Sequence, residues 1–410
     1  MNKPALKTMG RRQWSKHVEQ ASLRHPASVV AAAIRAYAAM TDDGHKFALA
    51  DEIAMTRGPE LTLAYRNVVS VAAGFRMRTT PGAPRVRKRV PCVTFIVRRK
   101  WDKNDADPAH VQHLPAHLLT FADIGGKRQL CAVPTDVQTE DAFYGATPHG
   151  ASAVHIDDID VEAYGAATCL VKVGAGKAAK TMLMSARHVF SPHPEIVATP
   201  ASKLAVSALH NGQRSAPPLA RTSRHGGLLH GNGSVSFDVQ LADIANLNAA
   251  VALVQRMRTD GKLDYVASVD ALVRLSHTAP WEVLVPADNP LWHGDGARPN
   301  MMVELGEMMS STFGFEYRVR EHGALVKRHI TFWRLMRVKV QGSEPLLAGD
   351  SGSALVAWER QAGGAINCVL LGMFIGSNST HAYVIPAWQL FDRDYYASLP
   401  PGDVLQPVRP

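Results

Sequence analysis

The sequence predicts a mainly β protein that begins with helices and a small α/β region. After residue 150, short apolar runs alternate with turn residues, as in the segments 167–173 and 181–186, which flank a glycine-containing turn at 174–177. Near the beginning of the chain, residues 27–40 are rich in alanine and in other good helix formers. These two observations divide the chain into a helical beginning and a strand-rich remainder.

The N-terminal part is expected to contain two structures in succession. Residues 49–55 and 60–73 continue the helical pattern, whereas 91–97 and 130–137 are apolar runs typical of strands. Glycine and proline residues in 140–152 indicate a connector. We therefore expect a helical region, a small α/β module with its connector, and a main β domain, over residues 1–80, 81–150 and 151–400 respectively.

Composition places the chain among ordinary globular proteins. Its 410 residues are 46% hydrophobic and 20% charged, which is enough apolar sequence for a large core. The first twenty residues are basic and polar, and nowhere do about 18 apolar residues follow one another, as a membrane-spanning helix requires. We expect a soluble, cytoplasmic protein without a membrane partner.

The cysteine and histidine patterns predict no metal and no other cofactor. Four cysteines lie in apolar runs, without the close spacing of a disulfide framework or a zinc site: Cys92, Cys131, Cys169 and Cys368. This usage suits reduced thiols. Although the chain has 18 histidines, it has no HExxH motif.

A serine in a glycine-rich turn is the most informative feature of the chain. Residues 347–355 read LAGDSGSAL, so Ser351 follows Gly349 and Asp350 in a turn between two apolar runs. A serine hydroxyl is a weak nucleophile unless a base removes its proton and an acidic group orients that base. The motif therefore predicts a histidine and an aspartate elsewhere in the chain.

Candidates for both partners precede the serine. His188 follows the apolar strand predicted at 181–186, in a turn of small residues, so its imidazole is held at a strand end. Asp238 lies in the segment SFDVQL, where the following residues alternate between apolar and polar, as in a strand that enters a core. Asp243 and Asp260 are alternatives in the same interval, with less suitable strand contexts.

The order His188, Asp238, Ser351 resembles that of the trypsin-like serine peptidases of the chymotrypsin superfamily, over about residues 150–395. An α/β-hydrolase would need glycine where this chain has Ser353. Two further segments and a short helix are similar to the end of the family's second barrel: 368–377, 382–386 and 386–391. The resemblance implies a chymotrypsin-like double antiparallel β-barrel with the three residues in the cleft between the barrels.

The resemblance also implies a reaction. Ser351 would attack a peptide carbonyl, His188 would take its proton and return it to the leaving amine, and Asp238 would orient the imidazole. The family's oxyanion hole corresponds to the backbone N–H groups of Gly349 and Ser351. The expected function is that of a serine endopeptidase that cleaves protein or peptide substrates through an acyl-enzyme.

This chain departs from the family at several positions. Val189 and Leu347 stand where secreted members often have cysteines. No segment like Ile-Val-Gly-Gly precedes the domain, so we expect Asp350 to be held by something other than a freed N-terminus. The module at 81–150 is similar to one that precedes some bacterial intracellular trypsin-like domains.

Substrate specificity is less readable than the triad. The resemblance implies that the substrate-binding residues are Pro345, Phe374, Ile375, Gly376 and His381. Trypsin has an aspartate where this chain has Pro345, so a preference for basic side chains is not supported, and small or apolar side chains remain open. His381 is interpreted either as a group that accepts an acidic side chain or as a solvated hairpin histidine.

Positive charge is concentrated in one segment. Nine basic residues and no acidic ones lie between Arg76 and Lys100, which equals the whole formal net charge of +9. Such a segment suits an acidic partner or nucleic acid, or is a solvated surface. The alternative function that this allows is a catalytically silent trypsin-like scaffold that binds a protein or nucleic-acid partner.

Overall fold

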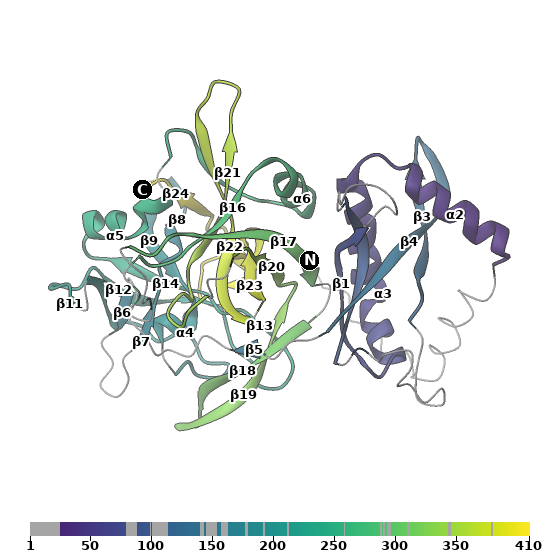
Figure 1. The fold of residues 1–410 in the computed structure, drawn as a ribbon. Coiled ribbons are helices and arrows are strands. Elements are labelled where there is room, and N and C mark those ends of the chain that lie inside the picture. Colours follow the sequence, from purple (N-terminus) through teal and green to yellow (C-terminus); the bar gives the residue numbers. More distant parts are fainter. Residues whose placement is uncertain are drawn as a thin grey trace. The chain divides into compact units, whose positions relative to one another are not determined.

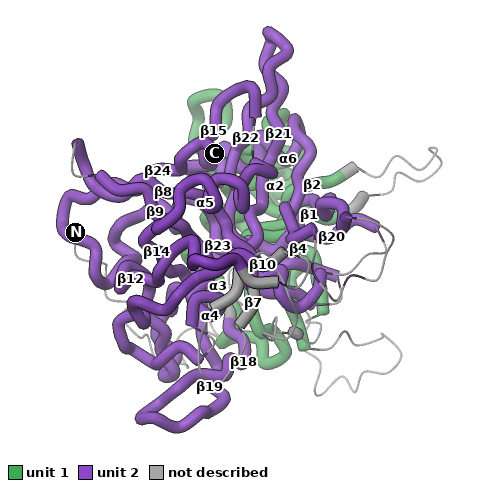
Figure 2. Tube along the Cα trace, turned by 90° about the vertical axis from the view of Figure 1, so that its left-hand side faces the viewer, with its two compact units in different colours: residues 1–140, 307–311 green, residues 141–306, 312–410 purple. Residues whose placement is uncertain are grey.

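A computed structural model describes most of the chain (Figure 1). The described residues are 25–78, 88–98, 100, 114–139, 143–144, 154–156, 163–176, 179–191, 193–210, 213–257, 259–287, 289, 292, 297–309, 312–342, 346–378 and 380–410. The chain forms two compact units, drawn in different colours in Figure 2. Unit 1 comprises Met1–Glu140 with Glu307–Ser311, and unit 2 comprises Asp141–Gly306 with Thr312–Pro410.

Unit 1 combines helices and strands. Its elements are α2 (Ala27–Ala39), α3 (Asp43–Ala64), β1 (Val68–Arg78), β2 (Lys88–Val97), β3 (His117–Ile124) and β4 (Lys127–Thr139). The strands lie in the order β1-β2-β4-β3. The expected helix at 27–40 and the strands at 91–97 and 130–137 are confirmed. Helices and strands pack together in this one unit, whereas the sequence pattern predicts two successive regions.

Two local features explain where the helices of unit 1 begin and end. The Asp42 carboxylate accepts a hydrogen bond of 2.8 Å from the backbone N–H of Gly44, which caps the start of α3. The expected helix at 60–73 is wrong in its second half, because β1 begins at Val68 and pairs antiparallel with β2. Several β-branched valines there favour a strand, and pairing with β2 overrides the helical pattern.

Unit 2 contains a nine-stranded sheet. Its strands are β6 (Val154–Ile156), β7 (Ala163–Gly165), β8 (Cys169–Val173), β9 (Lys180–Ser185), β10 (Ala205–His210), β11 (Gln213–Arg214), β12 (Ala220–Gly226), β14 (Gln240–Ile244) and β24 (Leu405–Val408). They lie in the order β24-β8-β9-β14-β12-β10-β6-β7, and β11 pairs with β10. Strands β8 and β9 form the expected antiparallel hairpin.

Unit 2 also contains strands that close into an antiparallel barrel. They are β16 (Trp281–Leu284), β17 (Met301–Met309, whose last three residues belong to unit 1), β20 (Met336–Val340), β21 (Ala354–Arg360), β22 (Ile366–Asn378) and β23 (His381–Pro386). The order β16-β21-β22-β23-β20-β17 closes because β16 pairs with both β21 and β17. Two short strands, β5 (Phe143–Tyr144) and β15 (Leu263–Tyr265), pair with β22. The protein is therefore mainly β and has a closed six-stranded antiparallel barrel.

A third, small sheet and several short helices complete unit 2. The sheet has the order β13-β19-β18, with β13 (Val235–Ser236), β18 (Thr312–Glu321) and β19 (Ala324–Trp333). The helices are α4 (Arg187–Phe190), α5 (Leu247–Val254), η2 (Gln255–Met257), α6 (Val269–Thr278), α7 (Ala387–Leu390) and η3 (Arg393–Tyr395). Among the described residues, none of the helices is long and apolar enough to cross a membrane.

Candidate active site

His188 lies just after the end of a buried strand, as expected. Strand β9 ends at Ser185, and His188 is the second residue of the short helix α4. The preceding residue, Arg187, is 1% exposed and donates hydrogen bonds to the carbonyl oxygens of Gly227 (2.8 Å), Glu195 (2.8 Å) and Ala198 (3.1 Å). These bonds attach α4, and with it His188, to two neighbouring loops.

Asp238 is bound to His188 through both carboxylate oxygens. It is fully buried, in the short stretch between β13 and β14. The backbone N–H of His188 donates to Oδ1 at 3.0 Å, and the imidazole Nδ1 lies 2.5 Å from Oδ2. The two sequence alternatives do not share this arrangement: Asp243 is exposed on β14, and Asp260 accepts a hydrogen bond from the backbone N–H of Ile366.

A tyrosine that the sequence analysis did not single out also contacts this carboxylate. The hydroxyl of Tyr317, on β18, donates to Asp238 Oδ2 at 3.0 Å. Burial by itself raises the pKa of Asp238, but the charge of His188 and the hydrogen bonds from His188 and Tyr317 outweigh it, so the pKa is lowered. The signal for this tyrosine is present in the sequence FGFEYRVRE, whose alternation of apolar and polar residues is typical of a half-buried strand.

Ser351 lies in a tight turn directly before β21. It is 2% exposed, and Gly349 and Gly352 on either side adopt φ values of 91° and 88°, which favour glycine. The backbone N–H of Ala166 donates to the Ser351 carbonyl at 2.7 Å. A Cβ atom on Gly352 would lie 2.1 Å from the Ala166 carbonyl oxygen and 2.5 Å from Ser185 Oγ. The serine turn is thus packed against the end of β9, three residues before His188.

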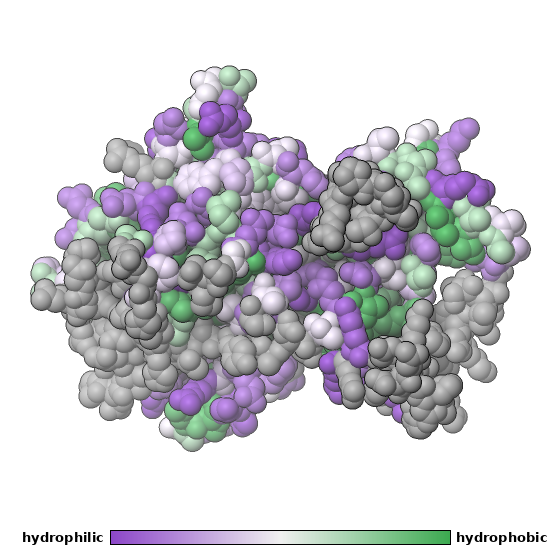
Figure 3. Space-filling model, in the orientation of Figure 1, coloured by the Kyte–Doolittle hydropathy of each residue, from purple (hydrophilic) through white to green (hydrophobic). Residues whose placement is uncertain are grey.

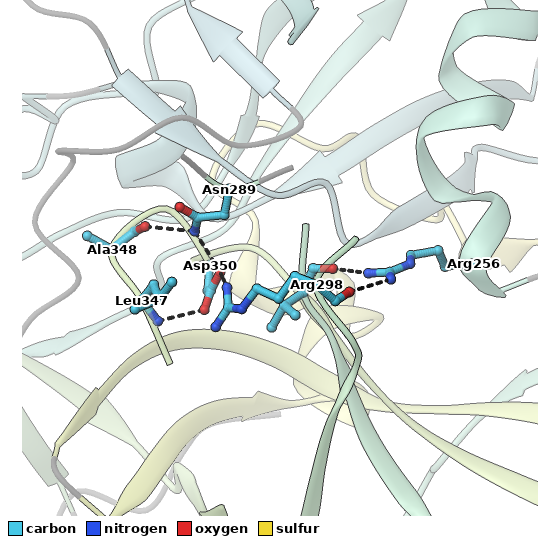
Figure 4. Close-up of polar contacts among 7 residues, drawn as sticks. Arg256, Asn289, Arg298, Leu347, Ala348 and Asp350 are labelled. Carbon is cyan, nitrogen blue, oxygen red and sulfur yellow. Dashed lines mark hydrogen bonds and ion pairs between the residues drawn. The ribbon is translucent and has the colours of Figure 1, made fainter. Parts of the chain in front are cut away.

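The side chain that precedes the serine is held by a buried ion pair (Figure 4). Asp350 and Arg298 both have fully buried side chains, and their Oδ1 and Nη1 atoms are 2.6 Å apart. Asn289 donates to the same oxygen at 3.0 Å, and the backbone N–H of Leu347 donates to Oδ2 at 2.7 Å. Burial raises the pKa of Asp350, and these donors oppose the rise. Asp350 is therefore held by an internal guanidinium group, which answers the expectation that something other than a free N-terminus holds it.

Two backbone N–H groups of the serine turn have no hydrogen-bond acceptor among the described residues. The N–H groups of Leu347, Asp350 and Ser353 donate hydrogen bonds within the turn, and that of Gly352 donates to the carbonyl oxygen of Phe374 on β22. In the described part of the chain, no hydrogen bond employs the N–H of Gly349 or of Ser351. These are the two N–H groups that the sequence resemblance assigns to an oxyanion hole.

His188 and Ser351, the expected base and nucleophile, are not hydrogen-bonded to each other in this structure. Nε2 of His188 is buried and has no partner among the described residues, and the Ser351 hydroxyl lies 3.5 Å from the carbonyl oxygen of Ile375. Such bonds are often long before substrate binds. The structure thus joins His188 to Asp238 and packs the serine turn against the end of β9, but it leaves Ser351 Oγ and His188 Nε2 without a bond to each other.

The expected substrate-binding residues differ in their settings. Pro345 lies outside the described residues, whereas Phe374, Ile375 and Gly376 are buried on β22. His381 is partly buried on β23, where its Nδ1 lies 2.7 Å from Thr380 Oγ1 and 3.1 Å from Nη2 of the buried Arg337. Burial and the charges of Arg337 and Lys339 lower the pKa of His381 to about 3, so the imidazole is neutral at physiological pH.

Only part of the basic segment belongs to the described residues. Arg85, Arg87 and Arg99 lie outside them. Within the described part, the guanidinium of Arg89 lies 4.2 Å from the ring centroid of Phe75, as in a cation–π contact. Among the described residues, no group of three or more His, Cys, Asp or Glu side chains is arranged to hold a metal ion.

Comparisons with known proteins add little to this geometry. No family model matches the chain, and no curated protein matches it. One solved structure that is similar to it is the NS6 protease from murine norovirus 1, at 12% sequence identity, over 50% of this chain and 80% of that chain. The TM-score of this match is 0.23, and a similarity of that size supports none of the conclusions below.

Proposed function

We propose that the protein is a serine endopeptidase with Ser351 as nucleophile, His188 as base and Asp238 as the group that orients the base. The observation that carries the proposal is the fully buried carboxylate of Asp238, bound to both the N–H and the Nδ1 of His188. A buried carboxylate that accepts from Nδ1 leaves Nε2 as the basic nitrogen, and stabilises the imidazolium that forms when Nε2 takes a proton.

The chemistry follows from these groups. Ser351 Oγ attacks the carbonyl carbon of a peptide bond while its proton passes to His188 Nε2. The resulting oxyanion accepts hydrogen bonds from the N–H groups of Gly349 and Ser351. The imidazolium then gives its proton to the leaving amine, which leaves an acyl-enzyme, and a water molecule activated by the same imidazole hydrolyses the ester. Each oxyanion donor typically contributes about a hundredfold to a thousandfold in rate.

We further propose that residues 151–400 form the family's two-barrel domain, with the closed barrel as the second barrel and the nine-stranded sheet as the first. The residues before it form an accessory region. The substrate is a protein or peptide. Because His381 is neutral, it supplies no positive charge for an acidic side chain, so we propose that the residue before the cleaved bond is small or apolar.

The test is covalent labelling by a fluorophosphonate probe, which reacts with activated serines. We expect the intact protein to be labelled on Ser351, and Ser351→Ala and His188→Ala to lose labelling. Ser353→Ala is the matched control, because Ser353 is a fully buried serine two residues away whose hydroxyl has no hydrogen-bond partner among the described residues. Labelling that persists in Ser351→Ala would contradict the proposed nucleophile, and unlabelled wild-type protein would favour the silent binding scaffold.

A further inference from the structure

A hairpin formed by β18 and β19 connects the closed barrel to the His188–Asp238 pair. The two strands pair from Thr312 to Trp333. Along the chain, the hairpin connects β17 to β20, two neighbouring strands of the barrel (Figure 1). Its outer part is polar, with the ion pairs Lys327–Glu316 and Arg328–Glu321. Hydrophobic and hydrophilic side chains are mixed at its far end (Figure 3), where Leu325 is 51% exposed.

Backbone hydrogen bonds join this hairpin to segments beside both members of the pair. β19 pairs parallel with β13, whose residue Ser236 stands two positions before Asp238. On the other strand, the N–H of Arg320 donates to the Pro194 carbonyl at 3.1 Å, and the Arg320 carbonyl accepts from the N–H of Ile196 at 3.2 Å. The segment 194–196 follows α4, the helix that contains His188. The hairpin is therefore fixed to the segment just before Asp238 and to the segment that follows the helix of His188.

Tyr317 is the hairpin side chain that reaches the carboxylate. It is 8% exposed, and its ring centroid lies 5.5 Å from that of His188. Phe315 and Phe332 pack against the same ring, at centroid distances of 6.4 Å and 5.8 Å. Burial and the neighbouring Asp238 raise the pKa of Tyr317 well above its ordinary value, so the phenol remains a donor throughout the working pH range.

We propose that Tyr317 is a positioning residue for the catalytic pair: its hydroxyl fixes the carboxylate of Asp238 in the orientation that serves both donors of His188. This inference rests on the proposed function. The carboxylate has two oxygens, and the N–H of His188 uses Oδ1 while Nδ1 and the phenol share Oδ2. Without the phenol, Oδ2 has one donor fewer and the carboxylate is freer to rotate about its χ2 angle.

The phenol also affects the electrostatics of the base. The titratable or charged groups that interact with Asp238 in the described structure are His188, Tyr317 and Arg187. Of these, Tyr317 is neutral, and the dipole of its O–H group offsets part of the negative charge on Oδ2. Removal of that dipole leaves more negative potential at the imidazole, which favours the imidazolium. His188 should then lose its proton at a higher pH, so the rate of labelling should rise at a higher pH than in the wild type.

The test compares Tyr317→Phe with Phe315→Leu. The first removes one hydroxyl and keeps the ring, and the second disturbs the same aromatic packing without touching Asp238. For Tyr317→Phe we expect the second-order rate of fluorophosphonate labelling to fall about threefold to tenfold, and the acid limb of its pH profile to move to higher pH. For Phe315→Leu we expect lower thermal stability with the acid limb unmoved.

A second measurement separates this inference from the proposed function. In a Ser351→Ala background, which cannot form an acyl-enzyme, the His188 ring is titrated by NMR with and without Tyr317→Phe. A titration midpoint raised by Tyr317→Phe supports the positioning role, even if the wild-type protein proves unreactive toward the probe. Equal midpoints and equal acid limbs would overturn it, whatever the activity of the wild type.

Should Tyr317→Phe fail to fold, 3-fluorotyrosine at position 317 provides a gentler change. Fluorination makes the phenol a stronger donor, so the NMR midpoint and the acid limb should both move to lower pH. An unchanged midpoint in the fluorinated protein would overturn the proposal.

Discussion

Asp238, in the proposed catalytic site, and Asp350, next to Ser351, are both fully buried, yet their partners differ in kind. Asp238 is paired with a phenol and with an imidazole, a group that gains and loses a proton in the proposed mechanism. Asp350, next to Ser351, is paired with the guanidinium of Arg298, which is always charged. The pKa of Asp238 is lowered and that of Asp350 is raised. In the proposed mechanism the first carboxylate orients the base, and the second carboxylate holds the turn that contains Ser351.

The largest expected effect comes from Asp238→Asn, which alters the partner of the base. An amide cannot stabilise an imidazolium and favours the wrong tautomer of His188, so the labelling rate should fall by about 10⁴. Asp243→Asn, on the exposed side of β14, is the control and should leave the rate unchanged. A loss of less than tenfold in Asp238→Asn would contradict the role assigned to this carboxylate.

Next in size is Arg298→Met, which leaves the carboxylate of Asp350 buried without its counter-charge. Breaking a buried ion pair typically costs about 3–5 kcal/mol, so the free energy of unfolding, measured by urea denaturation, should fall by about that amount. The double variant Arg298→Met with Asp350→Asn removes both charges and should recover part of the loss. As a surface control, Arg274→Met breaks an ion pair with Glu359 in which the arginine side chain is 58% exposed, and should cost about 1 kcal/mol or less. Equal losses from the two arginine variants would contradict the account of Asp350.

The smallest effect concerns the pH dependence of stability, for which the two aspartates have opposite signs. Because the pKa of Asp238 is lowered on folding, its contribution is present above the unfolded value of about 3.9 and is lost as the pH falls through the folded pKa. The pKa of Asp350 is raised, so its contribution is present below about 3.9 and is lost as the pH rises through the folded pKa.

Urea denaturation of the wild type, Asp238→Asn and Asp350→Asn across the acid range measures this difference. Relative to the wild type, Asp238→Asn should lose less stability as the pH falls, and Asp350→Asn should lose less as the pH rises. The same direction of change in both variants would show that the two carboxylates do not differ in this way.

Local pattern was enough to find the three proposed catalytic residues. His188 follows an apolar strand, Asp238 precedes alternating residues, and Ser351 lies between glycines, and each context is visible within ten residues of sequence. Residues 68–73, the first part of β1, are predicted as helix because a short apolar run after a helix fits both periods, and only pairing with β2 decides between them.

Local sequence pattern does not identify the side chains that contact Asp238 and Asp350. Tyr317 lies 79 residues from Asp238, and Arg298 lies 52 residues from Asp350. The alternation around Tyr317 predicts a strand but does not say what the strand contacts. An arginine in a loop is ordinarily exposed, so nothing near Arg298 in the sequence indicates that its side chain is fully buried. Contacts between distant segments depend on strand order, which the sequence pattern left open.

The most direct test of the central claim is a crystal structure of the protein after reaction with a fluorophosphonate. The account predicts phosphorus bonded to Ser351 Oγ, a phosphonyl oxygen within about 3.1 Å of the N–H nitrogens of Gly349 and Ser351, and His188 Nε2 turned toward the adduct. An adduct on another residue, or a phosphonyl oxygen directed away from both N–H groups, would contradict it.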